Sequence, residues 1–365
     1  MSVWDWVGAY RKTAGTAKDE PRYRMSSQYF ESCKFTETDP DRRLALLERG
    51  RELAVKLAEP WWVLFYDHWR IQTLMNQRQD FRAAQALAIH AAVEVRLPRY
   101  AHFPQRICLH EDLISTYSGI DGSGYAEEIQ QALDYMQDQV SPDLECRFCL
   151  QGQRVDFAVV REQWPEAETL ALRLLDMSAA SAHEAAIAYG QLCFIRAHQE
   201  DWLALRQWAE AGEALVRRSL NAADQGLYRG YLVKFLLWQA LAARRTGEED
   251  QAQQFYRAAM TQVTPLGVTQ NRDYYYALRE FHAAQHDWER ALAAVEAELS
   301  TLAGKGHIAR ECDARLEHCR LLIHMGQSIE TELGSLRALA TELRKPGPFL
   351  AKLDELVPGS TASAI

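Results

Sequence analysis

Cys146 and Cys149 are the residues whose spacing comes closest to a chemical motif. A Cys-x-x-Cys pair can bind zinc or form a reversible disulfide. A zinc site needs a second pair of ligands at similar spacing, and no such pair lies nearby in the sequence. Because reduced cysteine is among the most buried residue types, we expect two thiols on one helix of a helical hairpin. A metal or redox role for this pair is the alternative.

A second group of candidate metal ligands lies near the C-terminus: His307, Cys312, His318, Cys319 and His324. Cys312 and Cys319 are seven positions apart and share one face of a helix, whereas His318 points about 100° away from Cys319. We therefore do not expect these side chains to converge on one ion.

The run His110-Glu111-Asp112 could suggest acid–base chemistry, but a short charged run on a helix is more often a solvated face. The glycine-rich phosphate loop, the dinucleotide fingerprint, the nucleophile elbow and the His-Glu-x-x-His zinc motif are all absent from the sequence. We therefore predict no catalytic residue, no metal site and no cofactor. The chain is expected not to be an enzyme, and an enzyme with an unrecognised site is the third hypothesis for its function.

The elements that carry these residues are expected to be helices. The chain has 365 residues, of which 48% are hydrophobic and 25% are charged. It contains 52 Ala and 43 Leu but only 16 Val and 12 Ile. Helix formers therefore dominate, and the β-branched residues typical of strands are scarce. This composition predicts an all-α protein.

Charge and hydropathy indicate a soluble cytoplasmic protein. The net charge is −9, and basic pairs such as Arg217-Arg218 and Arg244-Arg245 are soon followed by acidic residues. Nucleic-acid binding is therefore not expected. No apolar stretch is long enough to cross a bilayer, and the first 20 residues lack the apolar centre of a signal peptide, so no membrane association is expected. Seven scattered cysteines fit reduced thiols better than a secreted disulfide framework.

The sequence contains an internal repeat with a period near 41 residues. Its anchor is a large residue after a polar or glycine break, followed three positions later by a small residue. Clear copies are Phe81 with Ala84, Trp164 with Ala167, and Trp288 with Ala291. With five looser copies, the anchors lie at positions 42, 81, 125, 164, 202, 249, 288 and 328. Four prolines, Pro60, Pro98, Pro142 and Pro265, lie 16 to 18 residues after their anchors, where the second helix of each repeat is expected to end.

The repeat resembles the tetratricopeptide repeat. The segment from Leu236 to Ala259 carries the resemblance best, because large, small and aromatic residues lie at the family's packing positions: Leu236, Ala240, Ala243, Gly247, Ala252, Tyr256 and Ala259. The period is longer than the 34 residues of the standard motif. The resemblance implies an α-solenoid of about eight stacked helix-turn-helix units that forms a right-handed superhelix. We assign residues 1–24 to an N-terminal segment, 25–345 to the tetratricopeptide-like solenoid and 346–365 to a partly disordered C-terminal tail.

The same resemblance implies a concave groove lined by the first helix of each repeat. Counting back from the anchors gives the residues expected to contact a partner: Tyr66, Trp69, Asn76, His110, Tyr117, Lys234, Arg244, Tyr276 and Arg320. Aromatic rings beside long cations and an Asn suit an extended peptide. There are alternatives for some of them. The stripe from Trp61 to Trp69 has the spacing of a helix core, and Lys234 and Arg244 have the character of solvated surface.

The sequence thus predicts a non-enzymatic scaffold that binds a protein, a peptide or a second copy of itself. The alternative is a regulatory protein that senses a ligand or peptide and whose output domain is on another chain. About 40 residues precede the first clear repeat turn, which is too few for a helix-turn-helix domain and a linker.

Overall fold

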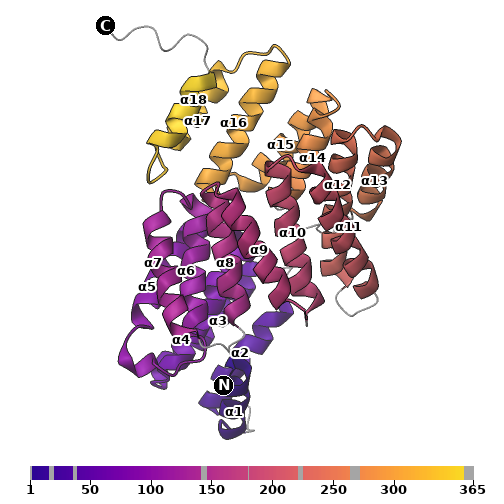
Figure 1. Cartoon of the computed structure of the whole chain (residues 1–365). Helices are drawn as coiled ribbons and strands as arrows, with labels where there is room; N and C mark the ends of the chain where they lie inside the picture. Colours follow the sequence, from indigo (N-terminus) through magenta and orange to yellow (C-terminus); the bar gives the residue numbers. More distant parts are fainter. Residues whose placement is uncertain are drawn as a thin grey trace. The chain divides into compact units, whose positions relative to one another are not determined.

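The computed structural model describes residues 2–15, 20–35, 39–140, 146–179, 181–220, 225–263 and 272–356. Every regular element in these ranges is helical (Figure 1), and no strand occurs in them. The all-α class predicted from composition is confirmed. The residues after Leu356, where disorder was expected, lie outside the described ranges, as do Pro142 and Pro265.

The chain divides by its internal contacts into two units, Met1–Gln153 with Gly304–His307, and Arg154–Ala303 with Ile308–Ile365. The α-helices of the first unit are α1 (Val3–Thr13), α2 (Pro21–Ser32), α3 (Pro40–Lys56), α4 (Pro60–Thr73), α5 (Phe81–Glu94), α6 (Arg106–Asp121) and α7 (Ala126–Gln139). Those of the second are α9 (Trp164–Met177), α10 (Ala182–His198), α11 (Trp202–Ser219), α12 (Gln225–Arg245), α13 (Glu249–Gln262), α14 (Arg272–Ala283), α15 (Trp288–Leu302), α16 (Ile308–His324), α17 (Glu330–Ala340) and α18 (Gly347–Leu356). The division lies within α8 (Cys146–Val160).

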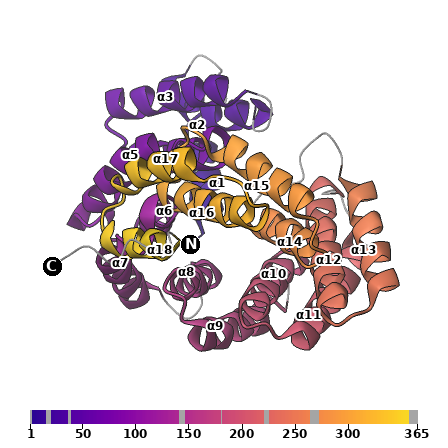
Figure 2. The same cartoon turned by 90° about the horizontal axis from the view of Figure 1, so that it is seen from above.

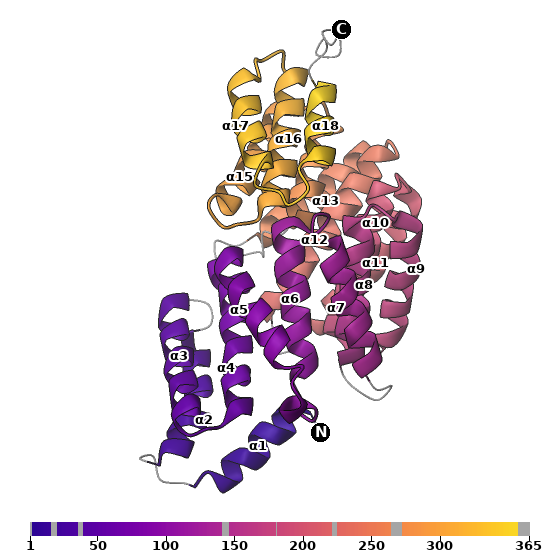
Figure 3. The same ribbon diagram turned by 90° about the vertical axis from the view of Figure 1, so that its left-hand side faces the viewer.

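The helices form hairpins at the predicted period. Five anchors, Phe81, Trp164, Trp202, Glu249 and Trp288, are the first residues of α5, α9, α11, α13 and α15. The anchors at 42, 125 and 328 lie within two residues of the starts of α3, α7 and α17. Consecutive helices pack side by side within each unit, as Figure 3 shows for α3 to α7. The stacked hairpins expected from the repeat are therefore present.

The same turn joins the two helices in six of these hairpins. The residue two positions before the anchor has a positive φ in each case: Gln79, Glu162, Glu200, Gly247, His286 and Gly326. This left-handed residue ends the first helix. In three of these hairpins an aspartate directly before the second helix then caps it. The carboxylates of Asp80, Asp201 and Asp287 accept the backbone N–H of the residue three positions later.

A small buried residue three positions after the anchor lets the helices approach closely. Ala84, Ala167, Ala252 and Ala291 are completely buried. Glycines serve the same purpose at positions where a neighbouring ring lies against the helix backbone. A Cβ atom on Gly212 of α11 would overlap the ring of Phe235 on α12. The apolar face of each hairpin is thus covered by its neighbour, as the repeat requires.

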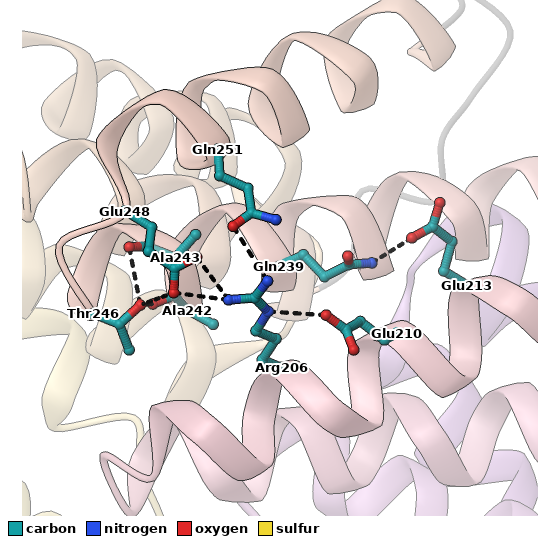
Figure 4. Close-up of polar contacts among 9 residues, drawn as sticks. All are labelled: Arg206, Glu210, Glu213, Gln239, Ala242, Ala243, Thr246, Glu248 and Gln251. Atoms are coloured by element: carbon teal, nitrogen blue, oxygen red, sulfur yellow. Dashed lines mark hydrogen bonds and ion pairs between the residues drawn. The ribbon is translucent and has the colours of Figure 1, made fainter.

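A network of polar side chains holds α11, α12 and α13 together in the second unit (Figure 4). The Arg206 guanidinium donates to both carboxylate oxygens of Glu248, at 2.8 and 2.9 Å, and to Glu210 at 2.9 Å. It also donates to Gln251 at 3.2 Å. A planar guanidinium that binds several oxygens at once fixes the register of the helices it joins.

The left-handed turn gives a paired prediction for stability. We expect Glu200→Gly to raise the free energy of unfolding by about 1 kcal/mol, because glycine adopts a positive φ without steric cost. Gly247→Ala, at the equivalent position of the next hairpin, should lower it by about the same amount. Urea denaturation measures both. A change in the same direction for the two variants would contradict the turn assignment.

The contact between Gly212 and Phe235 gives a second prediction. Gly212→Ala should destabilise the protein by about 1–3 kcal/mol through overpacking, although alanine is the better helix former. The matched control is Gly334→Ala on α17, where an added Cβ meets no atom within 4 Å. This variant should be more stable than the wild type by up to about 1 kcal/mol. Equal effects in the two variants would show that α11 and α12 do not pack at Gly212.

Candidate functional site

Three of the predicted partner-contacting residues are buried in the first unit. The Tyr66 hydroxyl donates to the carbonyl of Met25, and its ring lies against Gly50. His110 is fully buried, 4.2 Å from the ring of Tyr135, and burial lowers the pKa of its imidazole to about 3. Tyr117 stacks on a neighbouring tyrosine at 4.4 Å. The prediction of a partner-facing surface is corrected for these three residues, which belong to the packed interior.

Trp69 and Asn76 lie at the edge of the same packing. The half-buried Trp69 ring lies 4.8 Å from Tyr29. The core interpretation of this aromatic stripe is confirmed for its buried members Trp62 and Phe65. Asn76 is exposed, and its Nδ2 donates to Gln72 at 2.7 Å.

The charged run at position 110 is not the solvated face that its sequence predicts. Asp112 is fully buried and accepts hydrogen bonds from Gln72 Nε2 at 2.7 Å and from His68 Nδ1 at 2.8 Å. Desolvation opposes protonation of His68, but Asp112 outweighs it and raises the pKa of the imidazole. Glu111 is half-buried, and burial raises its pKa to about 7. Asp112 is thus part of a buried polar network between α4 and α6, whereas Glu111 is hydrogen-bonded to Cys149 and Gln153 of α8.

Two of the four predicted residues in the second unit have local structural partners. The Arg244 guanidinium lies over the ring of Phe281 at 5.4 Å and forms an ion pair with Glu249, so it ties α12 to α13 and α14. Arg320 is half-exposed and pairs with Glu317 on its own helix.

Lys234 and Tyr276 are the predicted residues that the structure brings together. They lie on α12 and α14, first helices of successive hairpins, which pack side by side with α10. In Figure 2 these helices form one row and α9, α11 and α13 form the other. We call the residues around Lys234 and Tyr276 the first-helix cluster. It comprises Asp156, Phe194, His198, Lys234, Trp238, Arg272, Asp273, Tyr276, Arg279 and Asp313.

Aromatic rings from three helices form the base of the first-helix cluster. The ring of Tyr276 lies 4.6 Å from His198, 5.5 Å from Phe194 and 5.9 Å from Trp238. His198 also stacks on the anchor Trp164 at 4.5 Å. Phe194 and Trp238 are buried, whereas Tyr276 is only half-buried. The cluster therefore exposes part of one ring, that of Tyr276, to solvent, and buried rings pack beneath it.

Cations lie above and beside these rings. The Arg272 guanidinium stacks over Phe194 at 4.1 Å, its side chain is 45% exposed, and its shortest contact with a carboxylate is 3.9 Å, to the adjacent Asp273. Lys234 lies over Tyr231 at 4.7 Å and forms no ion pair within the described part of the chain. Arg279, by contrast, is neutralised by Glu280 at 3.0 Å. Arg272 and Lys234 thus carry charge that close carboxylates do not neutralise.

Burial changes the protonation of the groups around Arg272. It raises the pKa of Asp156 to about 6 and that of Asp313 to about 6, although Arg272 opposes both shifts. It lowers the pKa of Lys234, an effect that Asp273 partly reverses. Burial, reinforced by Arg272 and Arg279, lowers the pKa of His198 to about 4, so the imidazole is neutral at pH 7. The first-helix cluster is therefore a desolvated polar site on an aromatic base.

The rings and cations of the first-helix cluster suit the binding of a partner. Within the described ranges no group of three or more His, Cys, Asp or Glu side chains is placed to hold a metal ion. The candidate ligands near the C-terminus are dispersed: Cys312 and Cys319 are buried, and His318 lies 3.6 Å from Glu296. Cys146 and Cys149 lie on the first turn of α8, as expected for two thiols on one helix of a hairpin.

The groove positions were obtained by a rule that counts 15, 12, 8, 5 and 4 residues back from each anchor, and the same offsets reach cluster residues that were not predicted. Eight positions before Trp164 lies Asp156, and eight and four positions before Trp202 lie Phe194 and His198. Arg272 lies 16 positions before its anchor, outside the rule, and no signal in the sequence marks it.

Comparisons with known proteins add no assignment to this geometry. Neither a scan against family models nor a search of curated proteins finds a match to this chain. Among the described residues, no helix is both long and apolar enough to cross a membrane.

The raised pKa of Asp156 predicts a specific pH dependence. Because the folded-state pKa of Asp156, about 6, exceeds the ordinary aspartate value of 3.8, the folded state binds the proton more tightly. The stability that this group contributes is fully present below pH 4 and is lost as the pH rises through 6. Asp156→Asn should therefore be more stable than the wild type above pH 6, by up to about 2 kcal/mol, and should match it near pH 4. Denaturant titrations between pH 4 and 8 measure this difference. A constant difference across that range would contradict the burial of this carboxyl.

Proposed function

We propose that this chain is a non-enzymatic interaction scaffold of the tetratricopeptide-repeat-like type. Its first-helix cluster binds an extended segment of a partner protein or peptide. The observation that carries the proposal is the pair Lys234 and Arg272. Arg272 lies over the ring of Phe194 and Lys234 over that of Tyr231, and no carboxylate of the described residues lies closer than 3.9 Å to either cation. Burial of the Lys234 ammonium is costly unless an anion neutralises it.

The chemistry of the cluster defines what the partner segment must offer. A carboxylate of the partner can bind Arg272 with two parallel hydrogen bonds, because the guanidinium lies over Phe194 and the side chain is 45% exposed. An apolar side chain of the partner can pack on the half-buried Tyr276 ring, which is already held by Trp238 and His198. Rings ordered before binding lose little conformational entropy when the partner arrives.

The composition of the chain supports an intracellular site of action. The net charge of −9 disfavours nucleic acid as the partner, and the described cysteines are all reduced thiols, as expected in the cytoplasm. We therefore propose a cytoplasmic protein or peptide as the partner.

The test compares two double variants by quantitative affinity capture from native lysate. Lys234→Glu with Tyr276→Ala reverses one charge and removes one ring on the first helices. Its matched control, Arg218→Glu with Leu203→Ala, reverses one charge and truncates one apolar side chain at exposed positions of α11. Recovery of the specific partner should fall at least about tenfold in the first variant and stay unchanged in the control. Circular dichroism and thermal melting confirm that both variants fold. Equal recovery by the two folded variants would overturn the proposal.

A further inference from the structure

Three thiols and a carboxyl lie together in the first unit. The thiol of Cys108 on α6 is hydrogen-bonded to the thiol of Cys146, the first residue of α8. The thiol of Cys149 is hydrogen-bonded instead to Glu111. Gln153 Nε2 donates to Ser115 Oγ at 3.0 Å, which holds the same two helices together. Cys108, Cys146 and Cys149 are all partly accessible to solvent.

These contacts separate the two cysteines that the sequence pairs. Spacing alone suggests a disulfide between Cys146 and Cys149, but each of these thiols has a different partner. Cys146 lies against a thiol from another helix, and two hydrogen-bonded sulfur atoms need only a small movement of the side chains to reach bonding distance.

We propose that Cys108 and Cys146 form a reversible disulfide that ties α6 to α8 under oxidising conditions. The bond closes a chain segment that includes all of α7, so it constrains one complete hairpin connection. This inference is independent of partner binding by the first-helix cluster.

The two thiols have different roles in forming the bond. The hydrogen bond with Cys146, together with burial and the nearby Glu111 and Asp112, raises the pKa of Cys108, which therefore stays protonated longer. Cys146 is thus the attacking thiol, and Cys108 is the resolving thiol.

The oxidant is a low-molecular-weight disulfide of the glutathione class. The Cys146 thiolate attacks one sulfur of the oxidant, which forms a mixed disulfide and releases one small thiol. The Cys108 thiolate then attacks the Cys146 sulfur, which forms the protein disulfide and releases the second small thiol. The two protons of the protein thiols leave on the two small thiols, so two electrons reduce one oxidant molecule.

The test begins with reduced full-length protein equilibrated with oxidised glutathione at pH 8. The reaction is quenched with acid, the remaining thiols are alkylated with N-ethylmaleimide, and the digested peptides are mapped by mass spectrometry. We expect Cys108 linked to Cys146, with Cys149 alkylated. A Cys146–Cys149 link as the main product, or full alkylation of Cys108, would overturn the proposal.

Two variants separate the assigned roles. Cys149→Ser should still form the Cys108–Cys146 bond, whereas Cys108→Ser should accumulate a stable glutathione adduct at Cys146. Loss of the bond in Cys149→Ser, or a Cys108→Ser protein that carries no adduct, would contradict the assignment of attacking and resolving thiols. A purified wild-type protein with one equivalent of zinc that disappears in Cys146→Ser would replace the disulfide with a metal site.

Thermal melting provides a readout of the cross-link itself. The oxidised wild type and the oxidised Cys149→Ser should both melt about 5 °C or more above their reduced forms, because the bond restricts the unfolded chain. Oxidised Cys108→Ser should show no such shift. A wild-type melting temperature that falls on oxidation would mean that the bond forms only by disrupting α6 and α8, which contradicts the proposed geometry.

Discussion

Close approach of paired helices at one small buried residue is the constraint on which the rest of the structure depends. In four hairpins this residue is an alanine three positions after the anchor, and none of the four has any accessible surface. The helix axes can approach to the distance that ridge-into-groove packing requires only if these side chains stay small. The aromatic or charged anchor lies where the second helix of the hairpin begins. The apolar helix faces that the hairpin does not cover itself are covered by the next hairpin.

This packing brings first helices together and so creates the first-helix cluster. Phe194, Trp238 and Tyr276 are about 40 residues apart in sequence, which is one repeat, yet their rings are in contact. Ion pairs such as those of Arg206 in Figure 4 fix the packing of the array. Several cations of the first helices are paired as well, among them Arg244 and Arg279. Lys234 and Arg272 differ from them, because no carboxylate of the described residues lies closer than 3.9 Å to either cation.

The sequence predicted the hairpins well because period, turn and small residue are local features of the chain. The partner-facing residues were predicted less well. Their prediction counts residues back from the anchor along the first helix, and it is wrong wherever the turn or helix contains an extra residue. In the hairpin of α4, a π-helix (η2, Leu74–Arg78) precedes the anchor Phe81 and adds one residue to the count. Counting back from Phe81 therefore reaches the half-buried Trp69 instead of the adjacent His68, which is part of the polar network.

The opposite shift explains the error in the next hairpin, where α7 starts one residue after the anchor. The count there selected the fully buried His110, whereas the adjacent Glu111 is only half-buried. In the hairpins of α12 and α14, which have the common turn and no π-helix before it, the count selected Lys234 and Tyr276, and these two helices pack side by side. Arg272 was not predicted, because its position in the cluster depends on the residue at which α14 begins. The sequence does not show that residue.

Hydroxyl-radical footprinting of the free and partner-bound protein tests the central claim most directly, because it reports side-chain accessibility at each ring. The half-buried Tyr276 of α14 should become protected when the partner binds, while the half-buried Trp208 on the second helix α11 should keep its rate of modification. Protection of Trp208 with no change at Tyr276 would place the partner on the other row of helices and would contradict the account.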